Sequence, residues 1–220
     1  MKGVSTTMLE DLSRYFNVSQ YNFINSETIN IFTDASYRHE HCASFGAMVE
    51  QGGLLLAYDL RGADPSQFSN NVLELKAIEL GIGLASIYGG NVPYVNIFSD
   101  SLYAVRAIKG LFKIKPGETI KNQEIIKEVV DQYYRFCTIR PNTNLNIFYT
   151  PAHINPKKQK QLNQAMHKFA VNNGMRSANS VDPGLMWYLC RMNNVIDNSV
   201  QKISRDPRNC ITTVDPIKFC

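Results

Sequence analysis

Three acidic residues stand where their carboxylates could converge on divalent metal ions. Asp34 follows the apolar run at residues 29–33, and Asp100 follows a similar run at 95–99. Runs rich in Ile, Val and Phe predict buried strands, and an acid just beyond such a strand emerges at the carboxyl edge of the sheet, where α/β folds bind ligands. Glu74 instead opens a long apolar helix. The spacing therefore predicts three acids gathered from distant parts of the chain.

Carboxylates are the ligands that hard divalent cations need, and two such cations about 3.5–4 Å apart are suited to phosphodiester hydrolysis. Each acid also has a simpler interpretation. An isolated aspartate after a strand is commonly a turn residue, and Glu74 alone would favour the N-terminal dipole of its helix. Metal binding is the stronger hypothesis because all three acids occur together, each on the expected kind of element.

The composition is that of a globular protein with a real core. The 220 residues have 44% hydrophobic and 19% charged side chains, and the formal net charge of +4 permits a polyanionic partner without requiring one. Five cysteines without C-x-x-C spacing indicate reduced thiols. The chain shows no signal-peptide pattern and no apolar stretch that could span a membrane, so we expect a cytoplasmic protein.

The elements that position these acids alternate between strands and helices. Hydrophobic periodicity predicts strands at about 29–33, 42–50, 53–60, 94–99 and 145–149, and helices at about 71–88, 101–109, 119–136 and 159–172. Gly52 and Gly53 predict a tight turn between the second and third strands. The order β-β-β-α-β-α-α-β-α predicts an α/β fold with a mixed five-stranded sheet flanked by helices.

The predicted core has an extension at each end. Residues 1–28 form an N-terminal extension with one short amphipathic helix, residues 29–173 the catalytic domain, and residues 174–220 a C-terminal extension. A helix carrying Trp187 is predicted at about 184–195. We expect the C-terminal extension to pack on the core, to dimerise or to dock on a replication protein, and the sequence leaves these three alternatives open.

Five short strings, in order, carry a resemblance to a known family. They are Thr33-Asp34-Ala35-Ser36, Asn70-Asn71-Val72-Leu73-Glu74-Leu75, Ser99-Asp100-Ser101, Thr150-Pro151-Ala152-His153, and the helix segment from Asn163 to Ala170. Each is weak alone, but together the core resembles type 1 ribonuclease H, with its T-D-G-S, N-N-x-x-E-L and T-D-S motifs, its late histidine and its closing N-x-x-A-D-x-L-A helix. The resemblance implies the ribonuclease H-like fold.

The resemblance also implies an activity and its cofactors. The chain is expected to hydrolyse the RNA strand of RNA–DNA hybrids with two divalent cations, Mg²⁺ or Mn²⁺, giving 5′-phosphate and 3′-hydroxyl ends. Asp34 would bridge both cations, while Glu74 and Asp100 would hold the one on the leaving-group side. His153 would take the place of the family's late, mobile histidine.

One position departs from the family pattern. Where the closing helix usually carries a fourth aspartate, this sequence has His167. Imidazole suits Mn²⁺ and other transition ions better than Mg²⁺, so the resemblance predicts a fourth ligand with altered metal preference. Taken alone, His153 and His167 are equally compatible with ordinary surface histidines.

The resemblance extends to the substrate contacts. Asn70 and Asn71 match positions that read 2′-hydroxyls in the minor groove of the RNA strand, and one of them is also suited to cap its helix. Ser69 and Asn122 match parts of a phosphate pocket for the DNA strand. The lysines between His153 and the last predicted helix, Lys157, Lys158 and Lys160, are expected either to add phosphate contacts or to be an ordinary solvated loop.

Two other functions remain open from the sequence. The first is a nuclease of the same superfamily that acts on DNA, such as a junction resolvase, although the Asn70-Asn71 pair disfavours it. The second is a domain that binds nucleic acid or a partner protein without cutting, its fourth ligand having been lost. Retention of Asp34, Glu74 and Asp100 argues against that second alternative.

Overall fold

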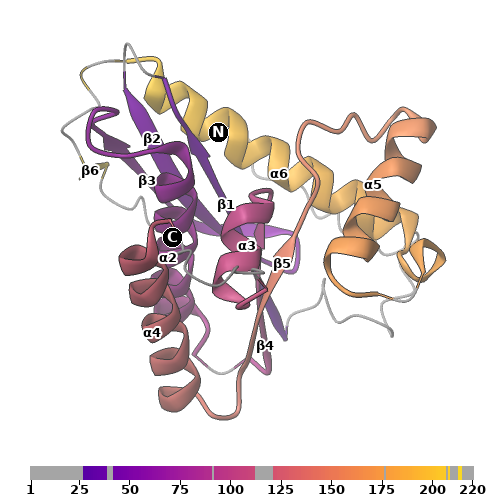
Figure 1. The fold of residues 1–220 in the computed structure, drawn as a ribbon. Coiled ribbons are helices and arrows are strands. Elements are labelled where there is room, and N and C mark those ends of the chain that lie inside the picture. Colours follow the sequence, from indigo (N-terminus) through magenta and orange to yellow (C-terminus); the bar gives the residue numbers. More distant parts are fainter. Residues whose placement is uncertain are drawn as a thin grey trace, which may run out of the picture.

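A computed structural model describes residues 27–38, 42–90, 92–111, 121–175, 177–206, 208 and 213–214. Its centre is a mixed sheet with the strand order β5-β4-β1-β2-β3-β6 (Figure 1). The strands are β1 (Thr28–Ser36), β2 (Ala43–Gln51), β3 (Leu54–Ala63), β4 (Tyr94–Ser99), β5 (Asn144–Tyr149) and the two-residue β6 (Thr213–Val214). The predicted five-stranded mixed sheet is confirmed, and β6 adds a short sixth strand beside β3.

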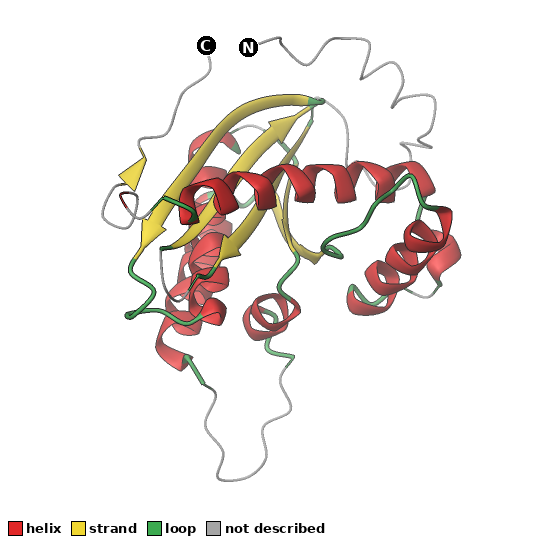
Figure 2. Ribbon diagram, turned by 90° about the horizontal axis from the view of Figure 1, so that it is seen from above, coloured by secondary structure: helices red, strands yellow, loops and turns green. Residues whose placement is uncertain are grey.

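The helices flank both faces of this sheet. They are α2 (Asn70–Tyr88), α3 (Leu102–Ile108), α4 (Gln123–Ile139), α5 (Gln159–Asn172) and α6 (Pro183–Ser204), with a short 3-10 turn at Ala178–Ser180. Figure 2 shows α6 lying across one face while α2 and α4 cover the other. Each predicted core helix is present with boundaries within a few residues of those expected. The short amphipathic helix predicted in the N-terminal extension lies outside the described residues.

Strand pairing explains why two of the acids meet. The tight turn at Gly52 and Gly53, both with positive φ, makes β2 and β3 antiparallel neighbours. By contrast, β1 and β4 run parallel with Thr33 opposite Ser99. The next residue in each strand direction is an aspartate, so Asp34 and Asp100 emerge side by side at the same edge of the sheet.

Two apolar cores lie on opposite faces of the sheet. One joins residues of β1, β4 and β5 such as Ile31, Ile97 and Ile147 to α2, α3 and α4. The other is centred on the stacked rings of Phe32, Phe98 and Phe148, and it is covered by α6 and α5. Since α6 supplies much of the second core, the packed domain extends beyond the predicted boundary at residue 173 and includes Ser204.

Buried hydrogen bonds between polar side chains connect α6 to β1 and β2. Glu50 is only 1% exposed and accepts hydrogen bonds from Asn30 Nδ2 at 3.0 Å and from the Tyr188 hydroxyl of α6. Asn96 and Asn146 continue the chain of amides across β4 and β5, with N–O distances of 3.2 and 3.1 Å. Burial raises the pKa of Glu50, while the donors from Tyr188, Asn30 and the Gly53 amide oppose that rise.

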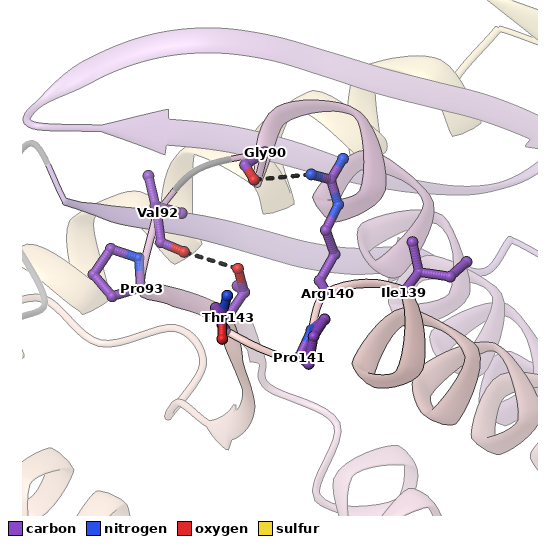
Figure 3. A pocket seen from close by; sticks show the side chains of 8 residues that line it. Gly90, Val92, Pro93, Ile139, Arg140, Pro141 and Thr143 are labelled. Carbon is purple, nitrogen blue, oxygen red and sulfur yellow. Dashed lines mark hydrogen bonds between the residues drawn. The ribbon is translucent and has the colours of Figure 1, made fainter.

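A hollow of about 410 Å³ lies between the loop that precedes β4 and the segment that joins α4 to β5 (Figure 3). Its polar groups are already used to hold these loops together. Arg140 donates to the carbonyl of Gly90 at 2.8 Å, and Thr143 donates to that of Val92 at 2.9 Å. We therefore interpret this hollow as part of the loop packing.

Among the described residues, none of the helices has the length and apolar content needed to cross a bilayer.

Close approach of α6 to β2 requires a glycine at position 46. A Cβ atom built on Gly46 would lie 2.4 Å from Leu60 Cδ2 and 3.2 Å from Val200 Cγ1 of α6. We expect Gly46→Ala to lower the free energy of unfolding by about 1–3 kcal/mol through overpacking, as measured by urea denaturation.

A control is available on α2. A Cβ atom added to Gly83 would meet no atom within 4 Å, so Gly83→Ala is expected to leave stability unchanged or raise it by up to about 1 kcal/mol. Equal destabilisation by the two substitutions would contradict the packing described for α6.

Candidate metal centre

The three acids predicted from the sequence converge at the carboxyl edge of β1 and β4. One oxygen from each of Asp34, Glu74 and Asp100 lies within 4.8 Å of the other two. Asp34 and Glu74 are 4% and 6% exposed, although such acids are rarely buried without partners. Asp34 Oδ2 and Glu74 Oε2 have no hydrogen-bond partner among the described residues. Buried oxygens that converge without donors fit the ligand set of a hard divalent cation.

Burial and mutual repulsion strongly perturb the protonation of these acids. The pKa of Asp34 rises from 3.8 to about 9, first because burial disfavours its charged form and then because Asp100 lies close to it. The pKa of Glu74 also lies well above its ordinary value, through burial and then the charges of Asp100 and Asp34. Burial raises the pKa of Asp100 as well, opposed by donation from Asn193. Nearby cations would reverse these shifts.

A fourth acid that the sequence reasoning missed comes from α6. Asp197 adds to the upward pKa shift of Asp34 through its charge and a side-chain hydrogen bond, and its charge also acts on Glu74 and Asp100. Asp197 is not one of the three acids whose oxygens lie within 4.8 Å of one another. Asp197 stands beside that cluster on α6, the helix that packs across β1 and β2.

Asn193 and His153 connect Asp197 to its surroundings. Asn193 lies one helical turn before Asp197, and its Nδ2 donates to Asp100 Oδ2 at 3.2 Å. His153 Nδ1 lies 3.6 Å from Asp197 Oδ2, while 73% of the His153 side chain is exposed. His153 also has a positive φ of 52°, which is uncommon outside glycine and places the ring at the rim of the site.

His167 does not join this group. It is exposed on α5, and neither the acid cluster nor the causes of the three pKa shifts include it. Among the described residues His167 lies apart from the three acids, because α6 and not α5 packs across β1 next to them. Its role as the fourth ligand stays a prediction. A signal was present in the sequence, since Asn193 and Asp197 have the spacing of the asparagine and aspartate in the family's N-x-x-A-D-x-L-A helix.

The predicted substrate residues lie at the starts of two helices. The N-cap of α2 is Ser69, whose side chain makes no capping bond, so the expectation that Asn70 or Asn71 caps this helix is wrong. Asn70 is exposed and Asn71 is half-buried, in the same first turns of α2 as Glu74. Asn122 precedes α4 in a left-handed conformation, with φ of 65°, and its Nδ2 donates to the Tyr103 hydroxyl at 3.1 Å.

Comparison with known proteins agrees with this geometry. The profile of the RNase H family matches residues 26–174, about two thirds of the chain. The chain belongs to the RNase H family. It is thus a ribonuclease H, a nuclease that acts on RNA–DNA hybrids. The matched range stops before α6, so Asp197 and Asn193 lie outside it. A search of curated protein sequences finds no match.

Solved structures of three ribonucleases H resemble the chain at low identity. RNase H1 from Halobacterium salinarum is 15% identical, with 56% of this chain and 86% of that one covered and a TM-score of 0.43. The N-terminal RNase H domain of Rv2228c from Mycobacterium tuberculosis is 19% identical, with coverages of 67% and 99% and a TM-score of 0.44. LC11-RNase H1, isolated from compost by metagenomics, is 23% identical, with coverages of 64% and 97% and a TM-score of 0.44. The family assignment rests on the profile match.

The raised pKa of Asp34 predicts how stability without metal depends on pH. Because the folded pKa lies above 3.8, the contribution of Asp34 is fully present below that pH and is lost as the pH rises toward about 9. The free energy of unfolding in EDTA should therefore fall between about pH 5 and about pH 9 in urea titrations. Mg²⁺ should reduce this fall, since it binds the folded state alone.

Asp34→Asn provides the matched variant. It removes an acid whose buried Oδ2 has no partner, so in EDTA at about pH 8 we expect a gain of about 1–3 kcal/mol, together with a shallower pH profile. An unchanged profile in Asp34→Asn would contradict the raised pKa of Asp34 in the folded protein.

Proposed function

We propose that this site cleaves the RNA strand of RNA–DNA hybrids with two divalent cations, leaving 5′-phosphate and 3′-hydroxyl ends. The observation that carries the proposal is the convergence of one oxygen from each of Asp34, Glu74 and Asp100 within 4.8 Å of the other two. In addition, one buried oxygen of Asp34 and one of Glu74 have no hydrogen-bond partner in the part of the chain that the structure describes. Membership of the RNase H family supports the substrate class.

Each acid has a role that follows from its position. When bound, two such cations activate the attacking water and stabilise the departing 3′ oxygen. By resemblance to the family, Asp34 is assigned as the ligand that both cations would share. Glu74 and Asp100 are assigned to the leaving-group side. Asp197 is assigned as the fourth carboxylate ligand, in place of His167.

Two residues of the rim and the covering helix support Asp197 and Asp100. Asn193 fixes one oxygen of Asp100 by donation and leaves the other oxygen for a cation. Because His153 is exposed and adjacent to Asp197, we assign it to exchange a proton between the reacting phosphate and solvent. With 73% of its side chain exposed, His153 is accessible to a bound substrate.

Substrate contacts are proposed at the starts of α2 and α4. Asn70 and Asn71 have no side-chain hydrogen bond among the described residues, so their amides are available to the 2′-hydroxyls of the RNA strand. Ser69 and Asn122 are assigned to phosphates of the DNA strand. These contacts explain how a hybrid would be distinguished from duplex DNA, since DNA has no 2′-hydroxyl.

Single substitutions of the two candidate fourth ligands separate the assignments. We expect Asp197→Asn to lower Mg²⁺-supported cleavage by at least about 100-fold, because even outer-shell partners of metal sites are worth about 10–100-fold. His167→Ala should remain within about threefold of the unsubstituted chain, because its side chain does not reach the acids. The measurement is the initial rate on a labelled hybrid in Mg²⁺ and in Mn²⁺. The opposite pattern would restore His167 as the ligand.

The substrate class is tested with labelled hybrid, duplex RNA, duplex DNA and branched DNA. We expect cleavage of the hybrid alone, abolished in Asp34→Asn, with 5′-phosphate ends on the products. Cutting of branched DNA would favour a resolvase. Binding of the hybrid without turnover in either metal would show that the site does not support cleavage.

A further inference from the structure

Positive charge is concentrated in one part of this sequence. Residues 132–181 contain seven Lys and Arg and no Asp or Glu, although the whole chain has 23 basic and 19 acidic residues. The remaining residues thus carry 16 basic against 19 acidic side chains and are net negative. The acid-free stretch includes the end of α4, β5, the loop that carries His153 and all of α5.

Helix α5 stands beside the catalytic edge. The loop at residues 150–158 leaves the carboxyl end of β5, which runs parallel to β4 and therefore ends at the same edge as Asp100. Asn194 of α6 donates to the carbonyl of Ile154 at 3.2 Å and fixes this loop next to the site. From there α5 packs on α6 through Leu162, Ala165 and Phe169, at the far side of the molecule from α4 and β6 (Figure 1).

The outward side of α5 and of the loop before it is basic and polar. We call it the α5 surface, and its exposed members are Lys157, Lys158, Lys160, Gln164, His167 and Lys168. None of its four lysines has an acid within 4.0 Å in the part of the chain that the structure describes. An exposed helix is ordinarily stabilised by acid–base pairs three or four residues apart, and α5 contains no acid to form them.

The placement of the charges also opposes helix stability. Lys158 is the N-cap residue of α5 and Lys160 lies in its first turn, where the macrodipole disfavours cations. An external polyanion would compensate both the unpaired lysines and the positive end of the helix. Lys, Gln and His side chains are also donors suited to the oxygens of a phosphate backbone.

We propose that the α5 surface binds the phosphate backbone of the nucleic acid substrate outside the catalytic site. This inference rests on the proposed function. Lys157 is four residues from His153, so their Cα atoms are at most about 14 Å apart. With about 3.4 Å of axis per nucleotide on one strand, that reach corresponds to phosphates within about four nucleotides of the cleaved bond. As a member of the α5 surface, His167 is assigned by this proposal to phosphate binding.

Charge-matched variants test the surface. Lys157→Gln/Lys160→Gln removes two positive charges from it, and Lys127→Gln/Lys202→Gln removes two from α4 and the last turn of α6. Binding of a hybrid of about 24 base pairs is followed by fluorescence anisotropy in EDTA between about 50 and 200 mM salt, and KM and kcat are measured in Mg²⁺.

For the α5 variant we expect the slope of log affinity against log salt to become shallower by about 2, close to 0.9 for each phosphate that is no longer neutralised. Its KM should rise at least about tenfold at about 50 mM salt, with kcat unchanged, because the reacting atoms are not touched. The control variant should keep the slope and KM of the unsubstituted chain.

Equal salt slopes in both variants would overturn the proposed surface while leaving hybrid cleavage intact. Loss of kcat in the α5 variant with an unchanged slope would also overturn it, since that result assigns the lysines to the reaction itself. If no form of the chain cleaves hybrid, the proposed function fails, and the anisotropy measurement still decides whether the α5 surface binds a polyanion.

Discussion

The acids at the carboxyl edge of the sheet repel one another, and much of the surrounding structure holds them together despite that repulsion. Asp34 and Asp100 cannot separate because β1 and β4 are paired in register up to Thr33 and Ser99. Glu74 is carried by a helix packed closely on β1, where Gly81 faces Thr33. The backbone therefore fixes the carboxylates before any cation arrives, and the raised pKa values of the acids reflect their burial and the repulsion that this arrangement retains.

Helix α6 completes the arrangement from the other face of the sheet. Its first half is anchored by Tyr188 on Glu50, and its second half by the backbone oxygen of Val200, which accepts from the Ser44 hydroxyl at 2.6 Å. Asp197 and Asn193 lie between these anchors, so their backbone positions stay close to Asp100 while the helix is docked on the sheet. Burying Glu50 is unfavourable by itself, and all three of its donors oppose that penalty only while α6 is docked, because Tyr188 belongs to this helix.

Most of the fold could be predicted from local sequence patterns. Periodicity placed the strands and helices, and the parallel ends of two of the strands placed Asp34 and Asp100 together. The fourth carboxylate could not be assigned in this way because two helices carry the same spacing, from Asn163 to His167 on α5 and from Asn193 to Asp197 on α6. Which helix lies over β1 depends on the match between a whole helix face and the aromatic residues of the sheet, a tertiary property that no short string contains.

Because α6 covers the sheet, α5 is left with a largely solvent-exposed surface. A helix that covers a sheet must present a broad apolar face, and α6 does so along its length, with Leu185, Leu189 and Val200 buried. Helix α5 buries only a narrow stripe against α6, so most of its circumference faces solvent and its polar residues are not constrained by the core. The proposed ligand role of Asp197 needs precise positioning of α6. The proposed phosphate binding by α5 does not, because attraction to a phosphate backbone extends over about 10 Å at about 0.1 M salt. The two helices share the spacing of Asn163 to His167 and of Asn193 to Asp197, yet they are under different physical constraints.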